Sequence, residues 1–155
     1  MPFLGTMGMP SDFGDLYRVP VRRVPAALTL ADGSRREGIL FVGCEDSVGA
    51  ALAGPRTFFP FDERGAVRIY AVAAVACISS GEVAGGADPS ERALRVRVHL
   101  QSGVILEGEV RFIPSQGKAR LLDALSEDAP SFVLVEARAV HHVQKAHVLL
   151  VEELS

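Results

Sequence analysis

Three histidines near the end of the chain are the side chains whose type and spacing suggest chemistry, because imidazole binds metal ions and transfers protons. They are His141, His142 and His147. On a strand, His141 and His142 point to opposite faces, so they cannot ligate one ion together. Neither a cysteine nor a carboxylate at ligand spacing completes a set of metal ligands. We therefore interpret the three imidazoles as packed or solvent-facing side chains and expect no metal.

The nucleophiles and acids also lack a recognisable catalytic pattern. The carboxylates are scattered, and no serine or cysteine has a histidine and an acid placed for nucleophilic catalysis. No glycine-rich phosphate loop occurs. Cys44 and Cys77 lie among apolar residues, which indicates two small buried side chains rather than a disulfide framework. The sequence thus favours a protein that is not an enzyme and needs no cofactor.

Composition and charge restrict the remaining functions. The chain has 155 residues, of which 48% are hydrophobic, with eight Phe, two Tyr and no Trp. This content supports a buried core and favours strands over long helices. The net charge of −3 provides no excess of positive charge to attract phosphate groups, which argues against binding of DNA or RNA. The N-terminus lacks a secretory signal, and no apolar run approaches the ~20 residues of a membrane span, so we expect a soluble cytoplasmic protein.

The pattern of strands and turns that would position any site occurs twice in the sequence. Alternating apolar stretches joined by a turn at Gly33, and again at Gly103, each predict a β-hairpin. The first block, around Gly33, recurs 70 positions later in the sequence. A second block, around Phe59, recurs 73 positions later, around Phe132. The order, spacing and apolar phase are kept across both blocks, which indicates an internal duplication. The matched pairs include Leu30 and Leu100, Glu37 and Glu107, Gly38 and Gly108, Glu63 and Glu136, Ala73 and Ala146, and Val75 and Val148.

Between the two blocks of each copy lies a segment that is helical rather than strand-like. Lys118–Leu125 places three leucines on one helical face, and Asp46–Ala53 is a poorer version of the same pattern. Each copy is therefore predicted to run through two strands, a short helix and three further strands. The predicted division of the chain is a flexible arm at 1–16, a first β-barrel repeat at 17–80, a linker at 81–90 and a second repeat at 91–155.

A V-x-L-x-x-G-x-x-x-x-G-x-V pattern occurs in the second copy at Val98, Leu100, Gly103, Gly108 and Val110, and it is echoed in the first copy by Leu28, Leu30, Gly33, Gly38 and Leu40. With these residues, each copy resembles the small five-stranded barrels of the Sm-like and SH3-like kind. The resemblance implies a mainly β protein with two duplicated five-stranded barrels, each with a short helix between strands 2 and 3. The chain is also similar to bacterial proteins of uncharacterised function that pair two such barrels. Sm-like proteins that bind RNA carry two motifs that this sequence replaces with Phe-Ile-Pro-Ser-Gln and Gln-Lys-Ala, so only the fold is carried over.

An arginine cluster suggests a ligand-binding alternative. Arg18, Arg22 and Arg23 form an R-x-x-x-R pattern, and Glu45–Gly49 follows about twenty residues later. This combination resembles the PilZ domains, whose arginines bind cyclic di-GMP by clamping phosphates or stacking on guanine. The second motif is altered here, because a glutamate replaces the leading Asp or Asn and the glycine comes one residue early. A cyclic dinucleotide is thus a partner only under this alternative.

The favoured interpretation is a scaffold or adaptor that acts through protein contacts and assembles with itself. Small barrels expose strand edges that pair with other chains. The run from Val67 to Ile78 is apolar on both strand faces apart from Arg68, so one face needs a cover. We therefore expect Val72, Ala74 and Ala76, or their alternate neighbours, to lie in an interface, and Phe58 to mark one as well. An Sm-like RNA-binding protein is the weaker alternative.

Overall fold

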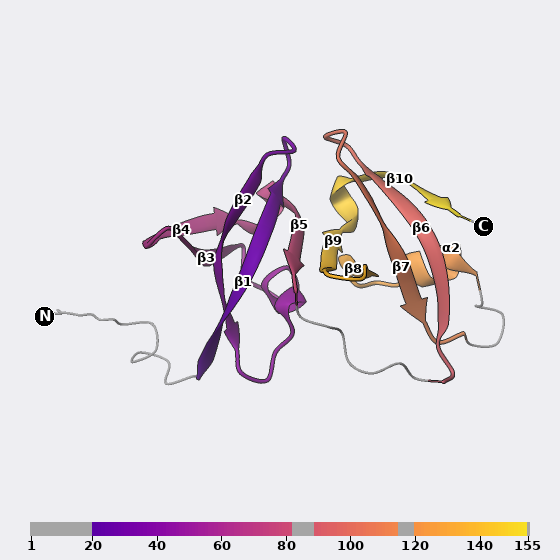
Figure 1. Cartoon of the computed structure of the whole chain (residues 1–155), viewed down its shortest axis with the longest axis horizontal. Helices are drawn as coiled ribbons and strands as arrows, with labels where there is room; N and C mark the ends of the chain where they lie inside the picture. Colours follow the sequence, from indigo (N-terminus) through magenta and orange to yellow (C-terminus); the bar gives the residue numbers. More distant parts are fainter. Residues whose placement is uncertain (1–19, 82–88, 115–119, 155) are drawn as a thin grey trace, which may run out of the picture.

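The computed structural model describes residues 20–81, 89–114 and 120–154. These residues form ten β-strands, joined by antiparallel pairing into one open sheet, with one short α-helix and three short 3-10 helices (Figure 1). Across the sheet the strands follow the order β10-β6-β7-β8-β9-β5-β1-β2-β3-β4. The expected mainly β fold is therefore confirmed.

The first half of the chain supplies β1 to β5, and the second half supplies β6 to β10. In the first half the elements are β1 (Val21–Leu30), β2 (Arg35–Gly43), η1 (Val48–Ala51), β3 (Phe58–Glu63), β4 (Ala66–Ala71), η2 (Val72–Ala74) and β5 (Val75–Ser80). In the second half they are β6 (Arg92–Leu100), β7 (Ile105–Phe112), α2 (Leu121–Leu125), β8 (Ser131–Val135), β9 (Val140–Gln144), η3 (Lys145–His147) and β10 (Val148–Glu153).

Both halves have the same strand order and the same pairing register. The order is β5-β1-β2-β3-β4 in one and β10-β6-β7-β8-β9 in the other. Residues matched by the sequence repeat occupy matching places in each ladder, including the irregularity where β1 meets β5 and β6 meets β10. The corresponding partners include Ala26↔Gly38 and Val96↔Gly108, Ile39↔Asp62 and Glu109↔Val135, Phe59↔Tyr70 and Phe132↔Val143, and Leu28↔Ile78 and Val98↔Val151.

The first hairpin turn of each half has the same geometry. Gly33 and Gly103 have φ of 90° and 99°, a region that side chains with a Cβ rarely adopt. Each glycine N–H donates to the carbonyl three residues earlier, of Leu30 or Leu100, at 2.9 Å. The predicted β-hairpins at these two turns are confirmed.

A second pair of glycines lies inside β2 and β7, where a neighbouring backbone passes very close. A Cβ at Gly38 would lie 2.2 Å from the Asp62 carbonyl oxygen, and one at Gly108 would lie 2.6 Å from that of Val135. No side chain fits at these distances, so glycine is required for β3 and β8 to approach.

Each half encloses its own hydrophobic cluster. Leu40 and Phe61 are fully buried in the first, and Val98 and Leu134 in the second. Strand β5 contributes to both: Val75 and Ile78 pack in the first cluster, whereas Ala76 and Cys77 pack in the second. The two halves are thus joined through shared packing around β5 as well as through the sheet.

Two expectations about these halves need correction. The described strands do not form two separate closed barrels, because β5 pairs with β1 on one side and with β9 on the other, which merges both halves into one open sheet. The segment after β2 forms only the 3-10 helix η1, because few residues separate Ser47 from the Gly54-Pro55 turn. The short α-helix of the second half is present as α2. The arm at 1–16 and most of the linker at 81–90 lie outside the described residues.

Candidate functional site

The place where the two halves meet is the pairing of β5 with β9, which we call the seam (Figure 1). Ser79 lies opposite His141 in this ladder, and Ile78 lies opposite His142. The buried hydroxyl Oγ of Ser79 is 2.6 Å from His141 Nδ1, and His141 Nε2 contacts a carboxylate oxygen of Glu136. The seam is therefore built from hydrogen bonds between side chains as well as from the backbone ladder.

Further polar side chains of the second half contact the backbone of η2 and of the first residue of β5. Gln144 Nε2 donates to the carbonyl oxygens of Val72 at 2.7 Å and Val75 at 2.8 Å. His147 Nε2 lies 2.8 Å from the carbonyl oxygen of Ala73. These contacts hold η2 and the start of β5 against the second half, which favours one register of the halves.

His142 fills the other side of the seam. It is buried, and a Cβ added at Gly49 in η1 would lie 2.6 Å from its Nδ1. The absence of a side chain at Gly49 therefore makes room for the imidazole ring. The interpretation of the histidines as packed side chains is confirmed for His141 and His142, and among the described residues no cluster of three His, Cys, Asp or Glu is arranged to hold a metal ion.

A carboxylate and a thiol nevertheless lie close to the Ser79–His141 pair. Glu136 contacts His141, and the Sγ of Cys77 is 3.6 Å from Ser79 Oγ on the same cluster. Sequence reasoning did not connect Ser79 with these histidines, because Ser79 comes from the other half of the chain. It also missed Glu136. Glu136, only five residues before His141 across the β8–β9 turn, was the one local signal.

The serine, histidine and glutamate of this cluster are the types used in nucleophilic catalysis, and here Ser79 and His141 lie opposite each other inside the β5–β9 ladder. Ser79 and His141 are both buried. The backbone of Ser79 is paired on both sides, with Ala27 in β1 and with His141 in β9, so the strand offers no turn of unpaired N–H groups for an oxyanion. The arrangement satisfies buried polar groups and orients the imidazole.

The cysteines have different environments. Burial raises the pKa of the Cys77 thiol to about 11, which keeps it protonated and unreactive at neutral pH. Cys44 is exposed, so its expected burial is wrong, because it lies just past the end of β2 where the chain leaves the sheet.

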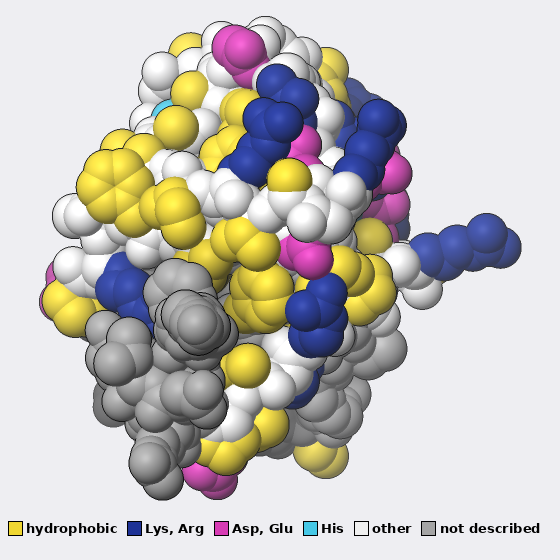
Figure 2. Space-filling model, turned by 90° about the vertical axis from the view of Figure 1, so that its left-hand side faces the viewer, with side chains coloured by type: hydrophobic (Ala, Val, Ile, Leu, Met, Phe, Trp, Pro, Cys, Tyr) yellow, Lys and Arg dark blue, Asp and Glu magenta, His cyan; other side chains and the backbone are white. Residues whose placement is uncertain are grey.

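The two ends of the sheet are the largest unpartnered features. Among the described strands, β4 pairs with β3 on one side only, and β10 pairs with β6 on one side only. Large apolar side chains are exposed on both: Val67 and Ile69 on β4, and Leu149 and Leu150 on β10. Figure 2 looks at the side of the molecule that carries β4 and shows hydrophobic side chains spread across it between basic ones. Unpaired edges with exposed apolar residues are sites where another strand adds.

The residues expected at an interface are distributed over several places. Ala76 is buried at the seam and packs in the cluster of the second half, whereas Val72 is half-buried and packs against the cluster of the first half. Ala74 is exposed in the single chain, because η2 turns it outward before β5 begins. Phe58 is exposed at the start of β3, next to the edge strand.

The arginine cluster is engaged by its own half. Arg22 donates to the carbonyl oxygen of Asp46 at 2.6 Å, which joins the two segments that resemble the PilZ motifs. Arg23 forms an ion pair with Asp62 at 3.1 Å and lies 5.1 Å from the centre of the Phe41 ring. Arg18 lies outside the described residues.

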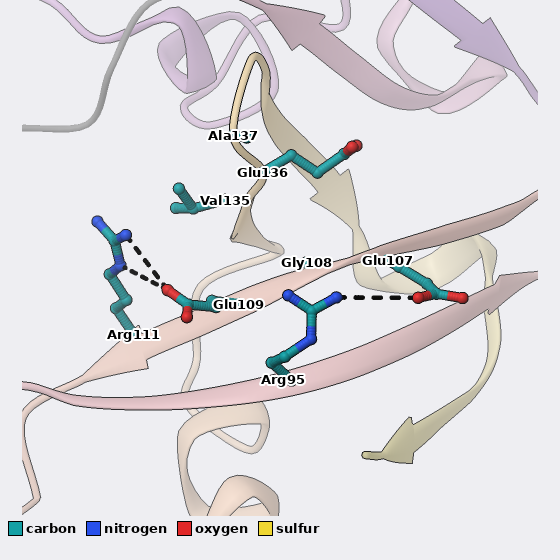
Figure 3. Close-up of a pocket in the computed structure, with 8 residues that line it drawn as sticks. All are labelled: Arg95, Glu107, Gly108, Glu109, Arg111, Val135, Glu136 and Ala137. Atoms are coloured by element: carbon teal, nitrogen blue, oxygen red, sulfur yellow. Dashed lines mark hydrogen bonds and ion pairs between the residues drawn. The ribbon is translucent and has the colours of Figure 1, made fainter. Parts of the chain in front are cut away.

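Two shallow depressions flank the β8–β9 turn. The larger, of about 500 Å³, contains ion pairs between Arg95 and Glu107 at 3.9 Å and between Arg111 and Glu109 at 3.3 Å (Figure 3). Its lining contains two arginines and three glutamates, so it has no excess of positive charge that would favour an anion. The smaller, of about 420 Å³, has Ser79 in its lining together with Arg35, Glu37 and Arg138.

The comparisons with known proteins add no assignment. The chain matches no protein-family model, no curated protein and no solved structure. In the described part of the chain, no helix is long and apolar enough to cross a membrane.

Proposed function

We propose that this protein is a non-enzymatic scaffold that assembles with copies of itself, and through them with protein partners, by adding strands at the free edges β4 and β10. The observation that carries this proposal is the exposure of large apolar side chains on both edge strands. Proteins that stay monomeric protect such edges with charges, prolines or covering segments.

The same proposal accounts for the repeated architecture. The shared strand order and register of the halves support an internal duplication, and the order β5-β1-β2-β3-β4 supports the resemblance to Sm-like and SH3-like units. The two halves already pair with each other within one chain through β5 and β9. Their remaining edges, β4 and β10, are therefore suited to pair with the edges of another molecule.

A test is to place a charge on one edge and measure mass in solution by light scattering. Ile69→Lys introduces an ammonium group in the middle of β4. This charge should weaken assembly and raise the dissociation constant at least tenfold. Ile105→Lys is the matched control, because Ile105 is equally exposed but starts an interior strand. A wild-type protein that is monomeric at every concentration, or equal effects of both substitutions, would contradict the proposal.

A cyclic-dinucleotide sensor is the second candidate, favoured by the contact between Arg22 and Asp46 that brings the two PilZ-like segments together. For this function Arg22 and Arg23 would exchange their contacts with the chain for contacts with the ligand. Calorimetric titration with cyclic di-GMP tests it, and the scaffold proposal expects no heat of binding.

A further inference from the structure

The two free edges are the repeat counterparts of the two strands that pair at the seam. The matched registers place β4 in the first half where β9 lies in the second, and β10 where β5 lies. Inside the chain β5 and β9 pair with each other, so each free edge has the same position in its half as a strand that is already paired.

Exposure differs at these matched positions. Val67 on β4 is 52% exposed and its counterpart Val140 on β9 is 4% exposed, while Ile69 is 57% exposed and His142 is 8% exposed. On the other edge, Leu149 is 66% exposed where Ala76 is 1% exposed, and Leu150 is 44% exposed where Cys77 is fully buried. The seam buries positions that the free edges leave in water, and on β10 the exposed leucines are larger than the Ala76 and Cys77 that occupy the matched positions at the seam.

The register of the seam predicts which residues would meet at a second seam. Ser79 opposite His141 corresponds to Glu152 opposite Arg68, and Ile78 opposite His142 corresponds to Val151 opposite Ile69. Cys77 opposite Val143 corresponds to Leu150 opposite Tyr70. The transferred register thus gives one pair of opposite charges and two apolar pairs, and each of these combinations stabilises antiparallel strands.

The charges at the two edges suit this pairing. Within the described residues, Arg68 is exposed and forms no ion pair, whereas Glu152 accepts a hydrogen bond from His99 at 2.6 Å and lies 3.7 Å from Arg97. Glu153 is the next residue on β10 and is also exposed. A guanidinium group placed opposite Glu152 would face the carboxylate of that residue, which His99 and Arg97 already contact.

The helix α2 adds a second surface. At the seam, η1 follows β2 and covers His142 through Gly49. In the second half α2 follows β7 in the same place, and its Leu122 is 63% exposed. If β4 of another copy paired with β10, Ile69 of that copy would take the place that His142 has at the seam. It would therefore lie on the side of the sheet that α2 covers, as His142 lies on the side that η1 covers.

We infer that β4 of one copy pairs antiparallel with β10 of a second copy, in the register that places Arg68 opposite Glu152 and Ile69 opposite Val151. This inference rests on the proposed function and names its partner and contact. The interface is head to tail, so each copy keeps one free β4 and one free β10 until the series closes into a ring or continues as a filament.

Disulfide trapping tests the register directly. In a Cys44→Ser background, one chain carries Arg68→Cys and another carries Glu152→Cys, and the two are mixed under mild oxidation. Directly opposite residues in adjacent strands have the separation that a disulfide needs. We expect a covalent dimer from the mixture at least tenfold more abundant than from either chain alone. Glu153→Cys replaces Glu152→Cys as the control, because its side chain points to the opposite face.

Charge reversal provides an independent measurement. Arg68→Glu would place two carboxylates opposite each other and should weaken assembly about tenfold, and adding Glu152→Lys to the same chain should restore it. Assembly that persists without the cross-link, or a cross-link between two copies of Arg68→Cys, would overturn this register but leave the scaffold proposal standing. A wild-type protein that is monomeric throughout would overturn both.

Discussion

Ser79 of β5 and His141 of β9 face each other across the boundary between the two halves, with Oγ and Nδ1 only 2.6 Å apart. The two residues are separated by 62 positions in the sequence and are both buried. Their hydrogen bond, extended to Glu136 on the other ring nitrogen, couples the halves into one unit. The seam therefore has a specific polar pattern in addition to the backbone ladder, and the free edges β4 and β10 present a different, apolar and charged pattern at the matched positions.

Removing the hydroxyl at the seam should destabilise the whole chain. Ser79→Ala leaves the buried Nδ1 of His141 without its partner, which costs about 1–3 kcal/mol in the free energy of unfolding. Ser47→Ala is the control, because Ser47 is exposed and its side chain makes no capping hydrogen bond at η1. Urea denaturation measures both. Equal stability of the Ser79→Ala variant and the wild type would show that the contact does not join the halves.

The interior glycines should not tolerate a methyl group. Gly38→Ala places a Cβ against the Asp62 carbonyl, so β2 and β3 must separate, and we expect a loss of about 1–3 kcal/mol or failure to fold. Gly108→Ala should behave in the same way against Val135. Gly81→Ala, with open space at its Cβ, should change the thermal midpoint little. A Gly38→Ala variant as stable as the wild type would mean that β3 does not pass close enough to Gly38 to exclude a Cβ.

The two thiols should differ in reactivity. Because burial raises the pKa of Cys77 to about 11, its thiolate is scarce at pH 8, whereas Cys44 is exposed. A colorimetric thiol reagent should modify one cysteine quickly in the folded protein and the second only after denaturation. Two fast thiols in the native state would place Cys77 outside the core.

Stability at acid pH should depend on one carboxylate of β10. The hydrogen bond from His99 lowers the pKa of the Glu152 carboxyl below its ordinary value of 4.5. A carboxyl with a lowered pKa stabilises the fold above that ordinary value and loses this contribution as the pH falls through the lowered one. The wild type should therefore lose more stability than Glu152→Gln between about pH 6 and about pH 3, on either side of the ordinary carboxyl pKa. Glu153→Gln, on the neighbouring position, should follow the wild type in a series of urea melts.

Much of the fold could be predicted from local signals. Alternating apolar residues marked the strands, and Gly33 and Gly103 marked the turns, because φ values of this kind need glycine. The offset between matched residues also gave the correspondence of the two halves, which the ladders reproduce. The unpredicted features depend on contacts between distant segments. Nothing near Ser79 indicates that its partner is His141, and nothing near Ala74 indicates that a 3-10 turn precedes β5.

The candidate site was harder to predict because an edge is defined by what does not pair with it. The run from Val67 to Ile78 correctly suggested a surface that needs a cover, since Ala76 and Cys77 are covered by the second half. The sequence did not show that the first part of the run, in β4, lies at the free end of the sheet. That distinction requires the pairing of β5 with β9, which no local pattern encodes.

Hydrogen–deuterium exchange measured at low and high protein concentration tests the central claim most directly. Backbone N–H groups that face outward on β4 and β10 exchange quickly in a free chain and slowly once another strand pairs with them. We predict that protection of segments 66–71 and 148–153 rises with concentration, while the interior strand β7 stays unchanged. Exchange at both edges that does not depend on concentration, in samples where light scattering shows assembly, would contradict assembly through the sheet edges.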